Sequence, residues 1–439
     1  MRSFVDLLET RGELIRISDK VSPRYEVAAI LKEVDRANGP AVIFERVEGY
    51  DIPVVGNLLG TKKRLALAFE TSEEKLRDEF LMRRKQGIPP KLIEDSSRDN
   101  VIKDQVDLLR DLPVLTYHEK DAGPYITGGV VFLKDPVTGT TSMGPHRIQI
   151  KDKDKVCVSL LAGNARRILE NVESRGEYLD VAIAIGLHPL TLLSAVTSMA
   201  KNKLEIAGGL RRVPVELIKC QMVDLHVPLE AEIVIEGKIP PGVREIDGPF
   251  GEVTGYYHTI KSSVIEVRSI TFRKNPLYQA ILPGSLEGKI VDEFTGSAQV
   301  LQDLKAHIPS IVDVKFSPIS HIIISMKKSS EGEPKRALLL ALMKYPYIKI
   351  GIAVDDDVDV NDSREVEWAI FTRSQGDKDI SIVPDLPGSP LDPSASNGLT
   401  AKLGIDATKP LKQLEKFEKI KIPEGSKKKA QSILKKLFG

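Results

Sequence analysis

The strongest constraint on the fold of this 439-residue chain is a change of pattern along the sequence. In the middle, from about residue 111 to 300, short apolar runs alternate with turn sequences such as Asp135-Pro136-Val137-Thr138-Gly139. Short strands between closely spaced turns are typical of a β-barrel or a β-sandwich. On both sides of this region, amphipathic helices alternate with short apolar strands, which indicates α/β structure.

Helix and strand signals divide the chain further. Ser22-Pro23 places a capping residue before a proline at the first turn of a helix, which ends at Asn38-Gly39-Pro40. The other expected helices cover residues 65–84, 165–175, 192–201, 297–307, 335–343 and 425–438, and two further strands cover 321–326 and 349–354. We predict an α+β multidomain fold, with an N-terminal α/β domain and connector over 1–110, a strand-rich domain over 111–300 and a C-terminal α/β domain over 301–439.

Composition narrows the classes of partner. The 63 Lys and Arg residues nearly balance the 62 Asp and Glu residues, so the chain lacks the long-range positive field that draws proteins to nucleic acid or anionic lipid. Cys157 and Cys220 have no CxxC spacing and give no signal for a zinc cluster or a disulfide framework. No apolar stretch approaches the roughly 18 residues of a membrane span. We therefore expect a cytoplasmic protein that binds no nucleic acid and does not insert into membranes.

The segment from residue 244 to 258 carries two acidic side chains around a tight turn. Asp247 and Glu252 flank Gly248-Pro249-Phe250-Gly251, and a backbone fixed by glycine and proline can turn both carboxylates toward one space. Two close carboxylates do not both ionise easily, so one of them becomes a candidate proton donor near neutral pH. The alternative is a hairpin loop with two solvated acids, and the pattern alone does not exclude it.

A second segment, residues 140–149, reads as a turn followed by a strand. Arg147 and Gln149 fall on one face of that strand, and His146 and Ile148 fall on the other. An arginine in this place can clamp a carboxylate through two parallel hydrogen bonds, a geometry that lysine cannot match. The alternative is a surface arginine in an ion pair beside a packed histidine.

Three further groups of residues are candidates for ion binding. The small residues of 394–408 either expose backbone N–H groups beside Lys402 to an anion or form a plain flexible loop. Asp355-Asp356-Asp357 follows an expected strand and either binds a cation or is simply solvated. Basic residues bracket Glu205 and form either a phosphate site or a basic surface strip: Lys201, Lys203, Arg211 and Arg212.

Several of these segments, in the same order, resemble the UbiD family of decarboxylases. The resemblance covers most of the chain and is carried by segments that include Glu216-Leu217-Ile218-Lys219-Cys220, Asp247-Gly248-Pro249-Phe250-Gly251-Glu252, Val354-Asp355-Asp356-Asp357-Val358, Trp368-Ala369-Ile370 and Lys402-Leu403-Gly404-Ile405-Asp406-Ala407-Thr408. It implies an N-terminal α/β domain, a central flavin-reductase-like split β-barrel that binds the cofactor, and a C-terminal α/β domain used in oligomerisation.

The resemblance also implies roles for the acidic and basic side chains described above. Family members share an Arg-Glu-Glu network, and Arg147, Asp247 and Glu252 occupy the matching positions, with the first acid shortened to aspartate. Arg147 then orients the substrate carboxylate and the cofactor, Asp247 positions Arg147, and Glu252 protonates the carbon that loses CO2. The family's cofactor is prenylated FMN, whose modified ring adds to the acid and accepts the electrons released with CO2.

By the same resemblance, the cofactor contacts fall on Ser142, Met143, Gly144, Pro145, His146, Arg147 and Asn164, with Lys402 near the phosphate end. In the family, a divalent metal (Mn or Mg) and potassium bridge the cofactor phosphate through asparagine, histidine and glutamate ligands. Here the asparagine position is Ser142, the histidine region reads Gly163-Asn164 and the glutamate is Glu205. Two of the three positions depart from the family's ligands, which leaves Glu205 and Ser142 as the implied metal ligands.

The resemblance implies a non-oxidative carboxy-lyase that acts on an α,β-unsaturated or aromatic acid. A low aromatic content of 5% and the basic residues around Glu205 favour a small phosphorylated acid such as trans-anhydromevalonate 5-phosphate in isoprenoid synthesis; a prenylated 4-hydroxybenzoate is the alternative. From other classes, a cofactor-independent hydrolase with Asp247 and Glu252 as an acid/base pair and a non-catalytic flavin carrier both stay open. The resemblance further implies a flavin prenyltransferase as the cofactor supplier and a homo-oligomer, either a dimer or a hexamer.

Overall fold

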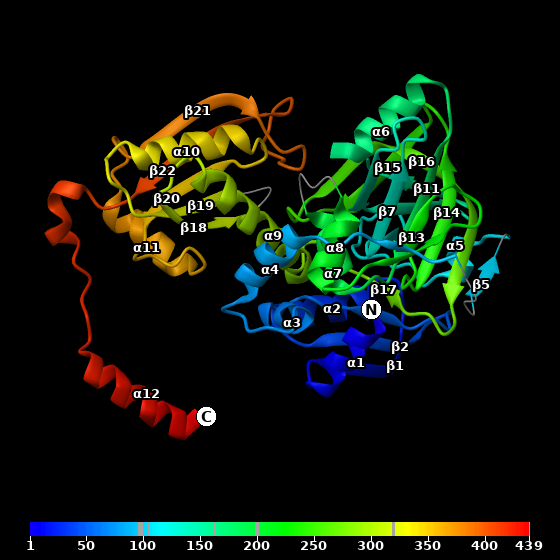
Figure 1. The fold of residues 1–439 in the computed structure, drawn as a ribbon, viewed down its shortest axis with the longest axis horizontal. Coiled ribbons are helices and arrows are strands. Elements are labelled where there is room, and N and C mark those ends of the chain that lie inside the picture. Colours follow the sequence, from blue (N-terminus) through cyan, green and yellow to red (C-terminus); the bar gives the residue numbers. More distant parts are fainter. Residues whose placement is uncertain (95–99, 104, 161–162, 198–201, 318–320, 439) are drawn as a thin grey trace. The chain divides into compact units, whose positions relative to one another are not determined.

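Figure 1 shows the fold as a computed structural model, which describes all residues except 95–99, 104, 161–162, 198–201, 318–320 and 439. The chain divides into two compact units. The first comprises Met1–Gln299 with two short returning segments, Phe316–Ile319 and Ser389–Ala395, and the second comprises the other residues from Val300 to Gly439. Among the helices that the structure describes, none combines the length and the apolar content needed to cross a membrane.

The first unit begins with a four-stranded sheet in the order β1-β2-β3-β17. Its strands are β1 (Leu14–Val21), β2 (Ala41–Val47), β3 (Val54–Gly56) and β17 (Tyr278–Gln279), and the helices of this part of the chain are α1 (Arg2–Thr10), α2 (Glu26–Arg36), α3 (Lys62–Ala68) and α4 (Leu76–Gln86). Because β17 pairs with β3, the chain returns to this sheet from the strand-rich region. Residues from both sides of the predicted domain boundary at residue 110 therefore share one sheet. The boundary itself stays a prediction.

The helical stretch expected over residues 65–84 is confirmed, and it is divided between two helices, α3 and α4. Thr61 caps α3, and its hydroxyl accepts a hydrogen bond from the backbone N–H of Arg64 at 3.2 Å. After α3, Glu70 has a φ of 52°, a left-handed conformation that an α-helix cannot contain. The helix announced by Ser22-Pro23 is confirmed as α2.

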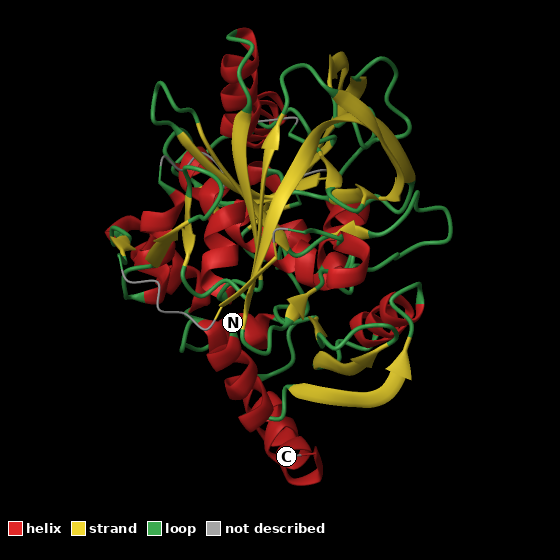
Figure 2. Cartoon of the chain, turned by 90° about the vertical axis from the view of Figure 1, so that its right-hand side faces the viewer, coloured by secondary structure: helices red, strands yellow, loops and turns green. Residues whose placement is uncertain are grey.

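A ten-stranded antiparallel sheet forms the centre of the first unit. Eight strands follow the order β6-β9-β10-β16-β14-β11-β7-β8, and β5 and β15 also pair with β16. The bounds are β5 (Asn100–Lys103), β6 (Tyr125–Ile126), β7 (Gly129–Lys134), β8 (Thr141–Pro145), β9 (Ile148–Asp152), β10 (Lys155–Val158), β11 (Leu179–Ile185), β14 (Ile233–Ile239), β15 (Arg244–Gly251) and β16 (Tyr257–Arg273). The 17-residue strand β16 pairs with four other strands along its length, and Figure 2 shows the sheet curling. The prediction of a strand-rich middle region is confirmed.

Strand β11 lies within this sheet, in a stretch where the sequence predicted only a helical insertion. The helices there are α6 (Gly163–Ser174), α7 (Pro189–Val196) and α8 (Lys203–Arg211), and the end of the second expected helix, residues 198–201, lies outside the described residues. Both faces of β11 are buried, because Val181 and Ile183 pack in one apolar cluster while Ala182 and Ala184 pack in another. Such a strand shows no alternation of apolar and polar residues, so periodicity cannot separate it from a buried helix.

The connector predicted at the end of the 1–110 range, about residues 85–110, contains regular structure. A three-stranded sheet has the order β13-β12-β4, with β4 (Lys91–Leu92), β12 (Glu216–Lys219) and β13 (His226–Pro228). The connector contributes β4 to this sheet and β5 to the ten-stranded sheet, and it ends in the short helix α5 (Leu108–Asp111). It is therefore tied to two sheets of the first unit.

The second unit is built on a five-stranded sheet in the order β18-β19-β20-β22-β21. Its strands are β18 (Ile311–Phe316), β19 (His321–Met326), β20 (Ile350–Asp355), β21 (Ile380–Pro387) and β22 (Leu399–Ala407). Its helices are α10 (Glu333–Lys344), α11 (Ser363–Arg373), the 3-10 helix η1 (Leu411–Phe417) and α12 (Glu424–Phe438), and the division between the units falls within α9 (Leu286–Lys305). The strands expected over 321–326 and 349–354 are confirmed as β19 and β20.

Two interpretations of the C-terminal region need correction. Residues 394–408 are not a plain loop, because residues 399–407 form β22, which pairs with both β20 and β21. The acids of residues 355–357 are not simply solvated: Arg373 donates to Asp355 at 2.6 Å and to Asp357 at 2.9 Å. This aspartate run therefore anchors helix α11 through Arg373.

Candidate active site

Arg147, Asp247 and Glu252 come from different parts of the curled sheet. Arg147 lies between β8 and β9, Asp247 lies on β15, and Glu252 directly follows β15. Between Asp247 and Phe250 the pairing of β15 with β16 is irregular, and two residues of β15 face one residue of β16. Such a bulge bends a strand and re-aims its side chains. At this bulge Gly248 has a φ of 112°, and a Cβ there would lie 2.5 Å from the carbonyl oxygen of His258, so a side chain is not tolerated.

The structure brings the three side chains together around the guanidinium group. Arg147 donates from Nε to Oδ2 of Asp247 at 3.2 Å and from Nη1 to Oε1 of Glu252. The Asp247 side chain is fully buried, and the side chains of Arg147 and Glu252 are only 10% and 13% exposed. Water screens such charges weakly, so this arrangement holds its geometry through charge-assisted hydrogen bonds. The interpretation of residues 244–258 as a loop with two solvated acids is wrong.

Two further residues, which the sequence did not single out, hold Asp247. The Tyr125 hydroxyl donates to Oδ1 at 3.1 Å, and the Ser262 hydroxyl donates to Oδ2 at 2.9 Å. Burial, together with the charge of Asp247, raises the pKa of Tyr125, so its hydroxyl stays a donor at neutral pH. The Tyr125 ring also packs on Phe250 with ring centroids 4.2 Å apart. No local signal marks these residues, because Tyr125 lies 122 positions from Asp247 in the sequence.

The substitution Tyr125→Phe tests whether the hydroxyl positions Asp247. The ring contact with Phe250 is kept, and one hydrogen bond to a carboxylate is lost, which costs about 1.5–3 kcal/mol. We expect a kcat about tenfold lower with little change in KM, and a lower free energy of unfolding in urea. The matched control is Tyr178→Phe, because Tyr178 is exposed. Unchanged kcat and stability in Tyr125→Phe contradict the positioning role.

One donor of the guanidinium group has no partner. Nη2 of Arg147 is buried, and no protein atom of the described chain accepts its hydrogen bond. A buried N–H without an acceptor is costly, so an arrangement of this kind fits a ligand that brings the acceptor with it. A carboxylate is the acceptor that a guanidinium group binds best.

A cavity of about 1400 Å³ is lined by six of the eight residues that the resemblance assigns to the cofactor, whereas Arg147 and Lys402 are not among its described lining residues. The six are Ser142, Met143, Gly144, Pro145, His146 and Asn164. The wall comes from β7, β8, α6 and the start of α8, all within the first unit. Ligand pockets are usually about 300–1,000 Å³ in volume, so this cavity has room for a flavin and a small acid.

His146 lies in the wall of this cavity and next to Arg147 in the chain. Its Nδ1 lies 2.7 Å from the carbonyl oxygen of Ser159, so Nδ1 carries a proton and donates it. Burial lowers the pKa of His146 to about 4. The ring is therefore neutral at physiological pH, which leaves Nε2 as an acceptor.

This pKa predicts a pH dependence of stability. The ordinary pKa of histidine is 6.5, so between pH 6.5 and 4 the unfolded chain binds a proton that the folded chain does not bind. Stability therefore falls as the pH falls through this window, and His146→Gln removes that contribution. We expect a flatter dependence of the unfolding free energy on pH between 4 and 6.5, measured by urea denaturation. The control is His307→Gln at an exposed histidine; a slope as steep as that of the unmutated chain contradicts the assignment.

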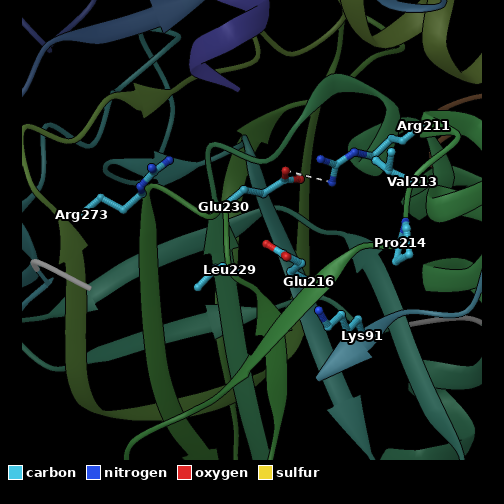
Figure 3. A pocket seen from close by; sticks show the side chains of 8 residues that line it. All are labelled: Lys91, Arg211, Val213, Pro214, Glu216, Leu229, Glu230 and Arg273. Carbon is cyan, nitrogen blue, oxygen red and sulfur yellow. Dashed lines mark ion pairs between the residues drawn. The ribbon is translucent and has the colours of Figure 1, made fainter. Parts of the chain in front are cut away.

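The other predicted anion-binding residues lie in different surroundings. Lys402 belongs to the second unit, is almost fully buried, and donates to the carbonyl oxygens of Pro346 and Ile348. Arg211 pairs with Glu230 at 2.8 Å beside a separate cavity of about 520 Å³, as Figure 3 shows. Other residues of the predicted basic strip are Arg212, which pairs with Glu79 at 3.0 Å, and Lys201, which lies outside the described residues. Of the described members of that group, Lys203 alone lines the large cavity.

The donors implied for a metal do not all line the cavity. Ser142 and Asn164 line the cavity, but Oε1 of Glu205 would lie 3.0 Å from a Cβ built on Gly87, so this carboxylate packs against the end of α4. Across the described residues, no three His, Cys, Asp or Glu side chains are grouped so that they could hold a metal ion. A hydroxyl and an amide alone lack the carboxylate that Mg²⁺ needs. This donor set does not fit a protein-bound divalent metal.

Known proteins match the chain over nearly its whole length. The 3-octaprenyl-4-hydroxybenzoate carboxy-lyase (UbiD) family matches in three parts, an N-terminal domain over residues 5–83, a Rift-related domain over 92–286 and a C-terminal domain over 289–407. The anhydromevalonate phosphate decarboxylase of Methanothermobacter thermautotrophicus is 35% identical over 428 residues, which cover 96% of this chain and 99% of that protein.

Solved structures agree with this match. The UbiD-class enzyme HmfF from Pelotomaculum thermopropionicum in complex with FMN is 37% identical, with a TM-score of 0.92 over 97% of this chain and 98% of that chain. An evolved dimeric form of HmfF in complex with prFMN is 35% identical, with a TM-score of 0.87 over 97% of each chain. With three matching domains in sequence order and a shared fold, the chain belongs to the UbiD family of carboxy-lyase decarboxylases.

Proposed function

We propose that this enzyme uses prenylated FMN to remove CO2 from trans-anhydromevalonate 5-phosphate. The observation that carries the proposal is the buried Arg147, which bonds Asp247 and Glu252 and keeps a third buried donor without a partner. The carboxylate of a substrate supplies the missing acceptor. The choice of substrate is supported by the Methanothermobacter relative, which carries the name anhydromevalonate phosphate decarboxylase and matches along its whole length.

Each side chain of the network has one task in this reaction. Prenylated FMN, when bound, supplies the electron-accepting ring that decarboxylation needs. Arg147 orients the substrate carboxylate through its fork of donors, and Glu252 holds the proton that the carbon receives after CO2 has left. Asp247 fixes the position of Arg147 and is itself held by Tyr125 and Ser262.

The cofactor is assigned to the cavity beside β7 and β8. Support comes from its volume of about 1400 Å³ and from the FMN and prFMN complexes of HmfF. The curled antiparallel sheet supports the finer assignment of a flavin-reductase-like split barrel. The described donors do not fit a divalent metal, so the positive charge for the cofactor is assigned to side chains of the protein.

The proposal also covers the supply of the cofactor, the oligomeric state and the cellular location. A flavin prenyltransferase supplies the modified flavin, because the isoprenoid addition to FMN needs its own enzyme. We infer a homo-oligomer, supported by the dimeric form of HmfF. We infer a cytoplasmic location, supported by two buried and unpaired cysteines, Cys157 and Cys220, since thiols stay reduced there.

One other substrate class has an observation in its favour. The large cavity has an apolar part formed by Phe132, Leu133 and Met143, which also suits a prenylated aromatic acid. The family description names such an acid, 3-octaprenyl-4-hydroxybenzoate.

The test is to co-express the protein with a flavin prenyltransferase, to record its absorbance and cofactor mass, and to screen acids for CO2 release. We expect the mass of prenylated FMN and release of CO2 from anhydromevalonate phosphate, with none from prenylated hydroxybenzoate. The reverse preference selects the second substrate class. A protein without flavin absorbance that hydrolyses its substrate contradicts the proposal and favours the hydrolase alternative.

A further inference from the structure

Lys203 places a positive charge in the wall of the large cavity without a negative partner. It is the first residue of α8, and its Nζ donates to the carbonyl oxygen of Ala195 at 2.5 Å. Both residues line the cavity. Among the described residues, no carboxylate pairs with this ammonium group.

The Lys203 ammonium group has hydrogen-bond donors left for a ligand. It has three N–H donors, and the carbonyl oxygen of Ala195 accepts one of them. A buried charge without a partner is unfavourable, and proteins normally pair it. The remaining donors and the unpaired charge are therefore suited to an anion that enters the cavity.

The other charges of the cavity wall favour an anion as well. The described lining contains three cationic side chains, Lys134, Arg167 and Lys203, against one carboxylate, Asp292. Lys134 pairs with Asp224 at 3.6 Å, and Arg167 is exposed and donates to the amide oxygen of Asn164. Lys203 is therefore the partly buried cation of the described lining that has no carboxylate partner. A phosphate group carries up to two negative charges and three acceptor oxygens, which an ammonium group binds as a compact point charge.

The metal donors implied by the family do not assemble here, as shown above for Ser142, Asn164 and Glu205. The cofactor phosphate in this chain then needs another source of positive charge. We propose that Lys203 binds the flavin phosphate directly and takes the place of a protein-held divalent metal. This inference rests on the proposed function, because it requires a flavin mononucleotide in the cavity.

Titrations of the metal-free protein with FMN and with riboflavin, followed by flavin fluorescence, test this role. The two ligands differ only in the phosphate, so Lys203→Met separates its contribution. We expect FMN affinity to fall about 10- to 100-fold in Lys203→Met, as for the loss of a charge-assisted hydrogen bond, and riboflavin affinity to stay the same. Lys203→Arg keeps the charge and is expected to retain most of the FMN affinity.

The matched control is Lys219→Met, because Lys219 is exposed on β12 and 3.8 Å from its nearest carboxylate, Asp224. Thermal unfolding of each variant checks the fold, and Lys203→Gln replaces Lys203→Met if the methionine variant does not fold. In the unmutated protein, EDTA is expected to leave FMN affinity unchanged, and elemental analysis is expected to find less than one Mn or Mg per ten chains, roughly, when FMN is bound.

The outcomes separate this inference from the proposed function. An unmutated protein that binds neither FMN nor riboflavin contradicts the proposed function itself. If FMN binds normally to Lys203→Met, or if EDTA weakens FMN binding and one Mn or Mg per chain is found, the flavin site stands and the role of Lys203 is overturned. A lower affinity of Lys203→Met for anhydromevalonate phosphate, without any change in FMN affinity, assigns Lys203 to the phosphate of the substrate instead, which also overturns the inference.

Discussion

Replacing Glu252 by glutamine is expected to stop CO2 release while the cofactor stays bound. Glutamine keeps the size of the side chain and still offers an oxygen to Nη1 of Arg147, but it cannot deliver a proton. General acid catalysis contributes about 10²–10⁴-fold to the rate, and we expect kcat to fall by this factor. Flavin absorbance of the purified variant and CO2 release under single-turnover conditions measure the two properties separately.

Glu245→Gln is the matched control for this experiment. Glu245 lies on the same strand, β15, and pairs with Lys155 at 3.0 Å on a half-exposed surface, away from Arg147. We expect its turnover to equal that of the unmutated enzyme. If Glu252→Gln also turns over normally, the proton comes from another group and the assignment of Glu252 is wrong.

Arg147→Lys is expected to lower kcat/KM by about 100-fold or more. Lysine keeps the positive charge beside the fully buried Asp247, so the variant avoids leaving a carboxylate without a partner. It lacks the planar fork, however, and cannot bond Asp247, Glu252 and a substrate carboxylate in one fixed geometry. Misplacement of a substrate by about 1 Å costs about 10²-fold in rate. Steady-state kinetics with cofactor content held equal measures the loss.

The control for this substitution is Arg166→Lys. Arg166 is exposed on α6 and pairs with Glu170 at 2.7 Å within the same helix, so its kinetics should not change. Normal kcat/KM in Arg147→Lys removes the guanidinium fork from the mechanism, whereas loss of flavin together with loss of activity moves its role from the substrate to the cofactor.

The sequence predicted elements whose packing follows a simple period. Strand β19 coincides with the predicted residues 321–326 because five of its six residues are buried and all of these except Ser325 are apolar. Strand β22 was missed for the opposite reason. Its buried positions alternate correctly, but they carry Thr400, Lys402 and Gly404, which a search for apolar residues does not detect.

The catalytic network shows a second limit. Asp247 and Glu252 lie close in sequence, and their spacing marked them as candidates, but Arg147 is 100 positions away from Asp247. At the level of the sequence, only the family resemblance placed Arg147 in one network with the two acids. Tyr125 and Ser262 carry no motif, and their role depends on the register of β6, β15 and β16, which the sequence alone does not determine.

The basic strip around Glu205 shows how burial decides between alternatives. Arg211 and Arg212 have carboxylate partners, Glu230 and Glu79, and their charge is already matched. Among the described residues, Lys203 has no carboxylate partner, and it lines the cavity. All residues of the strip carry the same charge, and the surroundings of the described ones identify Lys203 as the residue with donors left for a phosphate.

The most direct test of the central claim follows the carbon that loses CO2. Anhydromevalonate phosphate is incubated in D2O with enzyme that carries prenylated FMN, and the products are analysed by NMR. We predict one CO2 per substrate consumed and a product with one deuterium on the carbon that carried the carboxylate, because Glu252 exchanges its proton with solvent. Consumption of substrate without CO2, or a product without deuterium on that carbon, contradicts the proposed reaction.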